Sequence, residues 1–201
     1  HDGWLYFAES GALFRCRDAD KNGRADEEEI IMGKGKLPDG GAHDRRALLI
    51  HKDRIYTAIG DSGNITDEAK SPRQKIWSYA LDGSAETLYC SGLHNTQKLV
   101  IRPGTDEIWG MDEGTSWFGS AIEKKNGGKD TPISDAQPPS EMNRYDPNQF
   151  YGHPFIVGDK LPRSEFADRK DIVAQAKKSV SPMWPCGAQW NPIGMCFYDG
   201  K

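Results

Sequence analysis

Apolar and polar residues alternate over short stretches throughout the chain. The alternation is clear in residues 13–17 and again in residues 75–79. A period of two is typical of strands with one buried face, so the chain is predicted to be rich in short β-strands. The strands expected to pair are 4–8 with 12–17, 54–59 with 75–81, and 107–111 with 141–146. Further strands are predicted at 47–50, 86–90 and 97–102.

Three of these strands share a longer repeat. In each, an apolar strand tipped with an aromatic residue runs into a small acidic turn: 4–6 into 9–11, 54–56 into 61–63, and 107–109 into 112–114. Self-similarity at a period of about 40 to 50 residues, built from short strands and glycine-rich turns, indicates propeller blades. We therefore expect an all-β chain forming about three blades of a β-propeller, in which loops remote in sequence converge around one axis.

Two segments depart from the strand pattern. Between 164 and 178, the apolar residues Phe166, Ile172, Val173 and Ala176 form one narrow stripe, which predicts a short helical insertion on the surface. Residues 124–139 are rich in Gly, Lys, Asp and Pro, so a mobile loop is expected there. No domain boundary is apparent, and residues 1–201 are interpreted as one partial propeller, truncated at both ends.

Composition excludes several classes of function. The formal net charge is -4, and no basic stripe that would favour nucleic acid is present. No apolar run reaches the roughly 18 residues that would suggest a transmembrane segment. The four cysteines follow no zinc-binding spacing. A bridge between Cys186 and Cys196 is one possibility, but free thiols are favoured, with Cys16 and Cys90 as small buried residues on strands.

The sharpest local motif is a twelve-position calcium loop in the first repeat. Residues 18–29 match D-x-[DN]-x-[DN]-G-x5-E, a spacing that supplies the oxygen ligands calcium prefers. The predicted ligands are the side chains of Asp18, Asp20, Asn22, Asp26 and Glu29 and the backbone carbonyl of Arg24. The flanks are strand-like, so the loop is expected in a β-hairpin, where bound calcium would stabilise the blade. The alternative is a solvated acidic turn.

Two polar segments precede inner strands and are candidates for the functional site. Residues 40–46 hold His43 between flexible glycines and polar residues, where a propeller would expose it near its axis. Imidazole titrates near neutrality and suits a general base. The pattern alone favours a simpler interpretation, a surface histidine bonded to Asp44. Residues 91–97 either line the same mouth or cap a turn, and spacing does not decide between them.

The order of these motifs resembles a known family. Six segments carry the resemblance: 2–6, 41–44, 59–64, 91–95, 138–144 and 151–154. Together they are similar to the glucose/sorbosone dehydrogenases, soluble six-bladed β-propellers that use pyrroloquinoline quinone (PQQ). The resemblance covers about three blades and runs from about residue 2 to the end of the chain.

This resemblance implies a quinone-dependent oxidation of an aldose or sorbosone-type sugar. The family's catalytic histidine falls on His43, which would remove a proton from the sugar hydroxyl while hydride passes to the quinone. Asn95 falls on a position beside the quinone. The residue before it is usually Arg in the family but is His94 here, so a fixed cation is replaced by a titratable group.

The resemblance also implies two calcium ions. One would polarise the quinone and be bound by the backbone carbonyls of Gly114 and Thr115, where the family usually has Gly-Pro. The other would be bound by Glu141 and the carbonyl of Tyr151. The family's basic residues for the quinone carboxylates lie in later blades, which would come from a missing segment or another chain.

Other functions remain open at this stage. The main alternative is a non-catalytic, calcium-stabilised propeller module for adhesion or assembly, because a fold does not fix a function. A calcium-dependent lactonase-type hydrolase is a further alternative, although its converging carboxylate and Asn ligands are not found in the sequence. The resemblance and the need for calcium predict a periplasmic or secreted protein. Neither the sugar nor the electron acceptor follows from the sequence, and substrate choice would depend partly on the insertion 116–137.

Overall fold

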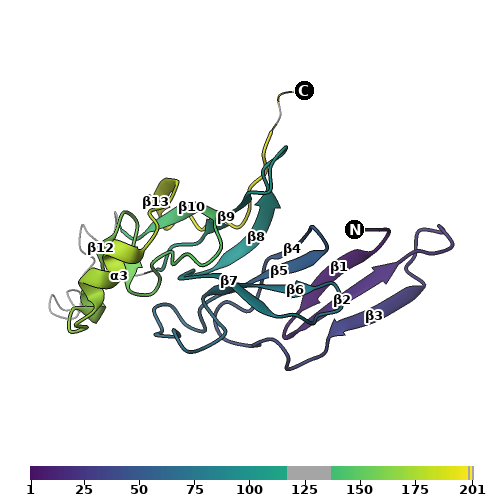
Figure 1. Ribbon diagram of the computed structural model, residues 1–201, viewed down its shortest axis with the longest axis horizontal. Coiled ribbons are helices and arrows are strands. Elements are labelled where there is room, and N and C mark those ends of the chain that lie inside the picture. Colours follow the sequence, from purple (N-terminus) through teal and green to yellow (C-terminus); the bar gives the residue numbers. More distant parts are fainter. Residues whose placement is uncertain (117–136, 199, 201) are drawn as a thin grey trace.

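Three antiparallel sheets lie side by side in the computed structural model, which describes residues 1–116, 137–198 and 200 (Figure 1). The first contains β1 (Leu5–Glu9), β2 (Ala12–Arg17) and β3 (Glu27–Met32). The second contains β4 (Leu48–His51), β5 (Arg54–Ile59), β6 (Lys75–Ala80) and β7 (Thr87–Ser91). The third contains β8 (Thr96–Ile101), β9 (Ile108–Asp112), β10 (Pro139–Tyr145) and β13 (Trp184–Ala188). We call these sheets the first, second and third blades.

The second and third blades have four strands each and are called complete. In both, strands that follow one another in the sheet order pair in antiparallel fashion. The first strands of the second and third blades, β4 and β8, lie against each other. The repeated motif seen in the sequence falls on β1, β5 and β9 and is the second strand in each complete blade. The strands β1, β2 and β3 of the first blade therefore correspond to the second, third and fourth strands of a complete blade. The architecture confirms the prediction of a partial propeller of about three blades.

Apolar side chains fill the spaces between adjacent blades. One buried cluster joins the first and second blades and includes Leu13, Ile55 and Tyr79. A second joins the second and third blades and includes Ile76 and Ile108. Truncating a buried isoleucine of this kind to alanine typically costs about 2–5 kcal/mol. The blades are therefore rigidly stacked, and the loops at their ends are carried by a fixed scaffold.

The helical insertion is shorter than the sequence predicted. It follows the small sheet of β11 (Ile156–Val157) and β12 (Leu161–Pro162) and consists of the 3-10 turn η1 (Ser164–Phe166) and the helix α3 (Ile172–Lys178). Between the two, Arg169 donates two hydrogen bonds of 3.0 Å to the carboxylate of Asp171, just before α3. The expected stripe is partly realised, since Phe166 packs on Phe155 whereas Val173 is exposed.

The structure also bears on the expected cysteine bridge, the predicted loop and the predicted absence of a transmembrane segment. Cys186 and Cys196 are free, so the suggested bridge between them is not formed; Cys90 is buried and Cys16 half-buried. Most of the predicted loop 124–139 and of the insertion 116–137 lies outside the described residues, but Pro139 already belongs to β10. In the described part of the chain, no helix has the length and apolar character needed to cross a membrane.

Candidate functional site

His43 lies in the loop before β4, and its proton position is fixed by a backbone group. Its Nδ1 is 2.9 Å from the carbonyl oxygen of Asp61, which follows β5. Because a carbonyl oxygen only accepts hydrogen bonds, the neutral ring carries its proton on Nδ1 and its lone pair on Nε2. The alternative bond to Asp44 is not formed: His43 pairs with Asp61 instead, and the Asp44 carboxylate accepts a hydrogen bond of 2.6 Å from Ser10. His43 therefore has the tautomer that a general base requires.

Two glycines allow the loop of His43 to approach the loop of Asp61. Gly41 has a φ of +86°, and a Cβ there would lie 2.8 Å from the carbonyl oxygen of Ser62. A Cβ on Gly60 would lie 2.9 Å from the Cβ of His43. The backbone N–H of Ala42 donates to the Ser62 carbonyl at 2.7 Å and joins the two loops. The glycine-rich sequence before β4 therefore permits close packing against the second blade.

Asp61 is fully buried, and its carboxylate is the centre of a hydrogen-bond network. It accepts bonds from His153 Nε2 at 2.7 Å, from Gln74 Nε2 at 2.9 Å, and from the backbone N–H groups of Gly63 and Thr66 at 2.7 and 3.0 Å. Burial alone raises the pKa of Asp61, but the hydrogen bond and charge interaction with His153 outweigh it and hold the pKa well below its usual range. Asp61 is therefore an anchored carboxylate.

Three imidazoles from different loops pack together beside this network. The ring centroids of His43 and His94 are 4.4 Å apart, and those of His94 and His153 are 4.9 Å apart. His94 Nδ1 donates to the carbonyl of Glu113 at 2.7 Å, and its buried Nε2 has no hydrogen-bond partner among the described residues. Burial, with smaller contributions from the two neighbouring imidazoles, lowers the pKa of His94 well below its ordinary value. His94 is therefore neutral.

A hollow of about 420 Å³ opens over His43. Its lining residues are Ala42, His43, Asp44, Arg45, Asn95, Gln97 and Glu113. Asn95 donates through Nδ2 to the carboxylate of Glu113 at 2.7 Å, whereas its buried Oδ1 has no hydrogen-bond partner among the described residues. The volume lies within the range of small-molecule sites, about 300–1,000 Å³. A polar hollow with a base and an unused acceptor suits a ligand rich in hydroxyl groups.

A second, much smaller cavity of about 20 Å³ lies beside His94 and contains two buried carboxyl groups. Asp112 accepts hydrogen bonds of 2.8 Å from the backbone N–H groups of His94 and Asn95. Burial raises its pKa to about 6. Burial, and then the charge of Asp112, raise the pKa of Glu141 to about 8. Two buried carboxyl groups beside one small cavity favour the binding of a cation, because its positive charge would offset the free-energy cost of ionising both.

The structure brings the residues expected at the calcium sites to this small cavity. Gly114, Thr115, Glu141 and Tyr151 all line it, together with His94. Gly114 is needed there because a Cβ would lie 2.6 Å from the carbonyl oxygen of Pro139. Only the backbone of Tyr151 is available as a ligand, since its hydroxyl donates to Arg144 and accepts from Asp146.

The predicted calcium loop of the first blade is assembled only in part. Carboxylate oxygens of Asp18, Asp20 and Asp26 lie within 4.8 Å of one another. Glu29 does not join them, because it lies on β3 and accepts hydrogen bonds from Arg15 on β2. Asn22 and Arg24 lie on the loop itself, and the side-chain oxygen of Asn22 accepts a bond of 2.9 Å from the N–H of Arg24.

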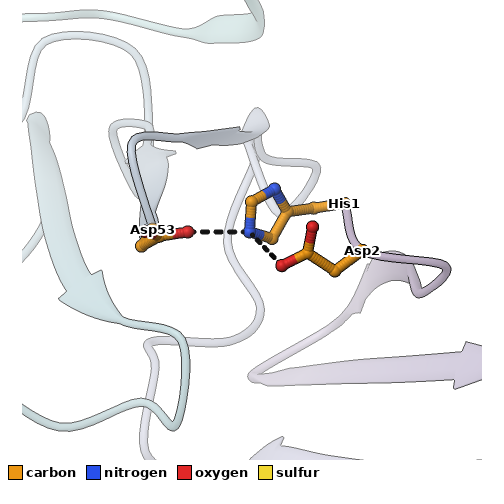
Figure 2. A group of neighbouring side chains, drawn as sticks. All are labelled: His1, Asp2 and Asp53. Atoms are coloured by element: carbon orange, nitrogen blue, oxygen red, sulfur yellow. Dashed lines mark hydrogen bonds and ion pairs between the residues drawn. The ribbon is translucent and has the colours of Figure 1, made fainter.

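Another group of metal-ligating side chains lies at the start of the chain. The Nε2 of His1 is 2.9 Å from Asp53 and 3.3 Å from Asp2, and all three residues are exposed (Figure 2). Asp53 belongs to the turn between β4 and β5. These three side chains form a surface contact between the segment before β1 and the second blade.

Several residues of the site were not identified from the sequence. Asp112 ends β9 and Asp61 follows β5, both within the acidic turns of the repeat, so the repeat itself contained a signal for both. Gln74 carried no such signal. The role of His153 depends on a contact with Asp61 across 92 positions, which no local pattern reveals.

No protein-family model matches the chain, and no curated protein matches its sequence. Solved structures do match its fold. A Carbohydrate-Active Enzymes Family AA12 protein from Trichoderma reesei gives a TM-score of 0.75 at 15% identity, over 92% of this chain and 53% of that one. A glucose dehydrogenase gives 0.65 at 19% identity, over 98% and 57%. The PQQ domain of a pyranose dehydrogenase from Coprinopsis cinerea, in its holo form, gives 0.71 at 13% identity, over 92% and 52%.

These comparisons define the class of fold. The chain has the fold of part of a β-propeller found in sugar dehydrogenases, and it spans about half the length of the structures it matches. The resemblance to PQQ-dependent sugar dehydrogenases predicted from the motifs is confirmed at the level of fold.

Proposed function

We propose that the chain carries the general base of a PQQ-dependent sugar dehydrogenase. The observation that carries this proposal is the pairing of His43 Nδ1 with the carbonyl of Asp61, which places the proton of the neutral ring on Nδ1 and its lone pair on Nε2, in a residue that lines a polar hollow. In the proposed reaction, Nε2 accepts the proton of a sugar hydroxyl, a contribution typically worth about 10²- to 10⁴-fold in rate. Bound PQQ would supply the hydride acceptor.

The residues present fit the cofactor and calcium. Asn95 lines the hollow, and its Oδ1 is a buried acceptor without a hydrogen-bond partner among the described residues. The backbone carbonyls of Gly114 and Thr115 would hold the calcium ion that polarises the quinone. Glu141 and the carbonyl of Tyr151 would hold the second ion. His94 is neutral and supplies a lone pair in place of the fixed charge expected from the resemblance.

The lining of the hollow supports a sugar as the proposed substrate class. Asp44, Gln97 and Glu113 offer acceptors and donors to several hydroxyl groups, which suits an aldose or sorbosone-type sugar. The basic residues for the quinone carboxylates would come from further blades, supplied by a missing segment or another chain. The proposed location is the periplasm or the outside of the cell, where calcium is plentiful.

A second candidate function is a non-catalytic, calcium-stabilised module for adhesion or assembly. The first-blade loop favours it, because Asp18, Asp20 and Asp26 gather on a hairpin outside the hollow. Bound calcium there would stabilise the blade without taking part in chemistry.

Reconstitution of the intact protein with PQQ and calcium tests the proposal. Addition of an aldose is expected to reduce an artificial electron-accepting dye, and His43→Gln is expected to lower kcat by at least about 10²-fold. His51→Gln is the matched control, since this second-blade histidine is bonded to Asp106 and does not line the hollow. Dye reduction that persists unchanged in the His43 variant would show that the catalytic assignment is wrong.

A further inference from the structure

Two buried cations lie on the segment that follows Asp61. Arg73 is 7% exposed and Lys75 is 8% exposed. The nearest carboxylate to Arg73 is that of Glu68, at 4.0 Å. Both cations instead donate their hydrogen bonds to backbone carbonyls. Buried charges need such partners, so the two side chains must hold specific backbone positions.

Arg73 joins the segment before His43 to the residue before Asp61. Its Nη2 donates to the carbonyls of Asp39 at 2.9 Å and Gly40 at 2.7 Å. Its Nη1 donates to the carbonyl of Gly60 at 3.4 Å. A single planar guanidinium therefore connects the two loops whose separation sets the distance from His43 Nδ1 to the Asp61 carbonyl.

Lys75 holds the loop that presents Arg73. Its ammonium group is surrounded by four backbone carbonyls, those of Glu68 at 3.2 Å, Ala69 at 3.3 Å, Arg73 at 3.1 Å, and Ser71. The arrangement is similar to a cation site built from carbonyl oxygens, with the ammonium of the chain itself as the cation.

External support matters here because the loop before β4 is rich in glycine. Gly40 and Gly41 both have positive φ values, and glycine loses more conformational freedom on ordering than other residues. Without hydrogen bonds from outside the loop, many conformations of residues 39–43 would compete with the one that places His43 beside Asp61. Neither Arg73 nor Lys75 lines the hollow, so any effect on the base is transmitted through the backbone.

We propose that Arg73 and Lys75, which we call the cationic clamp, are positioning residues for His43. The clamp keeps the Asp61 carbonyl within hydrogen-bond distance of His43 Nδ1 and so fixes the proton on that nitrogen. The kinetic part of this inference rests on the proposed function. The tautomer of His43 does not, and it can be measured without cofactor or sugar.

The test uses the intact protein with Arg73→Met and Arg73→Lys. In the ¹⁵N spectrum of the His43 ring, wild type is expected to show a protonated Nδ1, and Arg73→Met a mixture of both tautomers. With PQQ and calcium, Arg73→Met is expected to lower kcat by about 10²-fold, as misplacements of about 1 Å do, with KM nearly unchanged. Compared with Arg73→Met, Arg73→Lys should recover part of the Nδ1-protonated tautomer and part of kcat. Arg102→Met, at an exposed ion pair of the third blade, is the control that should change neither.

A second variant keeps the test decisive if Arg73→Met does not fold. Lys75→Ala empties the carbonyl cage, and added methylammonium is expected to restore the wild-type tautomer, whereas bulkier tetramethylammonium should not. The proposal is overturned if folded Arg73→Met and Lys75→Ala proteins both keep the Nδ1 proton and wild-type kcat. Failure of both variants to fold, even with methylammonium, also overturns it, because the clamp would then have only a structural role. If wild type oxidises no sugar but the tautomer changes as expected, the proposed function fails and the clamp stands.

Discussion

The backbone carbonyl of Asp61 accepts the Nδ1 proton of His43 at 2.9 Å, and this contact sets the chemistry of the imidazole. The carboxylate of the same aspartate accepts a hydrogen bond from His153 at 2.7 Å. One residue therefore orients two histidines that lie far apart in sequence. Because Asp61 is fully buried in the turn just after β5, the second blade determines where the base is held.

Gly60→Ala is expected to disturb the base by crowding its loop, without removing any polar group. The new methyl group would lie 2.9 Å from the Cβ of His43 and 3.0 Å from the carbonyl oxygen of His94. Such overpacking typically costs about 1–3 kcal/mol, which denaturant unfolding measures, and kcat should fall as well. Gly33→Ala is the control because a Cβ at that position meets no atom within 4 Å. Equal stability and activity in both variants would contradict the close packing described for these loops.

The stability of the protein should fall with acid through His94. Burial lowers the pKa of folded His94 below its unfolded value of 6.5, so the unfolded chain binds more protons once the pH drops below 6.5. The contribution of His94 is therefore complete above pH 6.5 and is lost as the pH falls toward the folded pKa, at about 1.4 kcal/mol for each unit of depression. Denaturant unfolding at pH 7.5, 6.5 and 5.5 measures it. His94→Gln should show a smaller loss between pH 6.5 and 5.5, and parallel curves would argue against a buried neutral imidazole.

Calcium binding at Glu141 should release a proton and become stronger as pH rises. The raised pKa of about 8 means that Glu141 is mostly protonated at pH 7 without a cation. The ion must displace that proton, so calorimetry should give a lower Kd at pH 9 than at pH 7. Calcium at 100 times its Kd would stabilise the fold by about 2.7 kcal/mol. Glu141→Gln should lose most of this gain. Glu107→Gln should keep it, because that residue does not line the small cavity and the change affects only its ion pairs with Arg102 and Arg144 and its hydrogen bond from Trp109.

The first-blade loop is expected to bind calcium through its three aspartates and without Glu29. Asp20→Asn should weaken binding of Ca²⁺ or luminescent Tb³⁺ at this loop at least tenfold, because it removes a charged ligand. Glu29→Gln should have little effect, since that carboxylate is engaged by Arg15. Measurements in the Glu141→Gln background isolate the loop from the small cavity. Equal losses from the two loop variants would show that Glu29 leaves Arg15 and completes the twelve-position pattern.

Four strands were missed, namely β3, β13 and the short pair of β11 and β12, and the structure explains the first two. Residues Glu27–Met32 show no alternation, and the first three of them were assigned to the calcium loop 18–29. They form β3 because Glu27 and Glu29 pair across the sheet with Arg17 and Arg15. Strand β13 contains both proline and glycine, which lower β-propensity. It is tolerated because it pairs only with β10, at the edge of the third blade.

The sequence by itself determined the repeating strands, the acidic turns that end them and the glycine-flanked position of His43. Periodicity and turn chemistry are local properties, so they can be followed along the chain. The tertiary structure decided which groups meet: the Asp61 carbonyl with His43, His153 with the Asp61 carboxylate, and Arg73 with the loop before β4. It also neutralised His94 and left Glu29 with Arg15. These outcomes depend on burial and on contacts between blades, which exist only once the sheets have stacked.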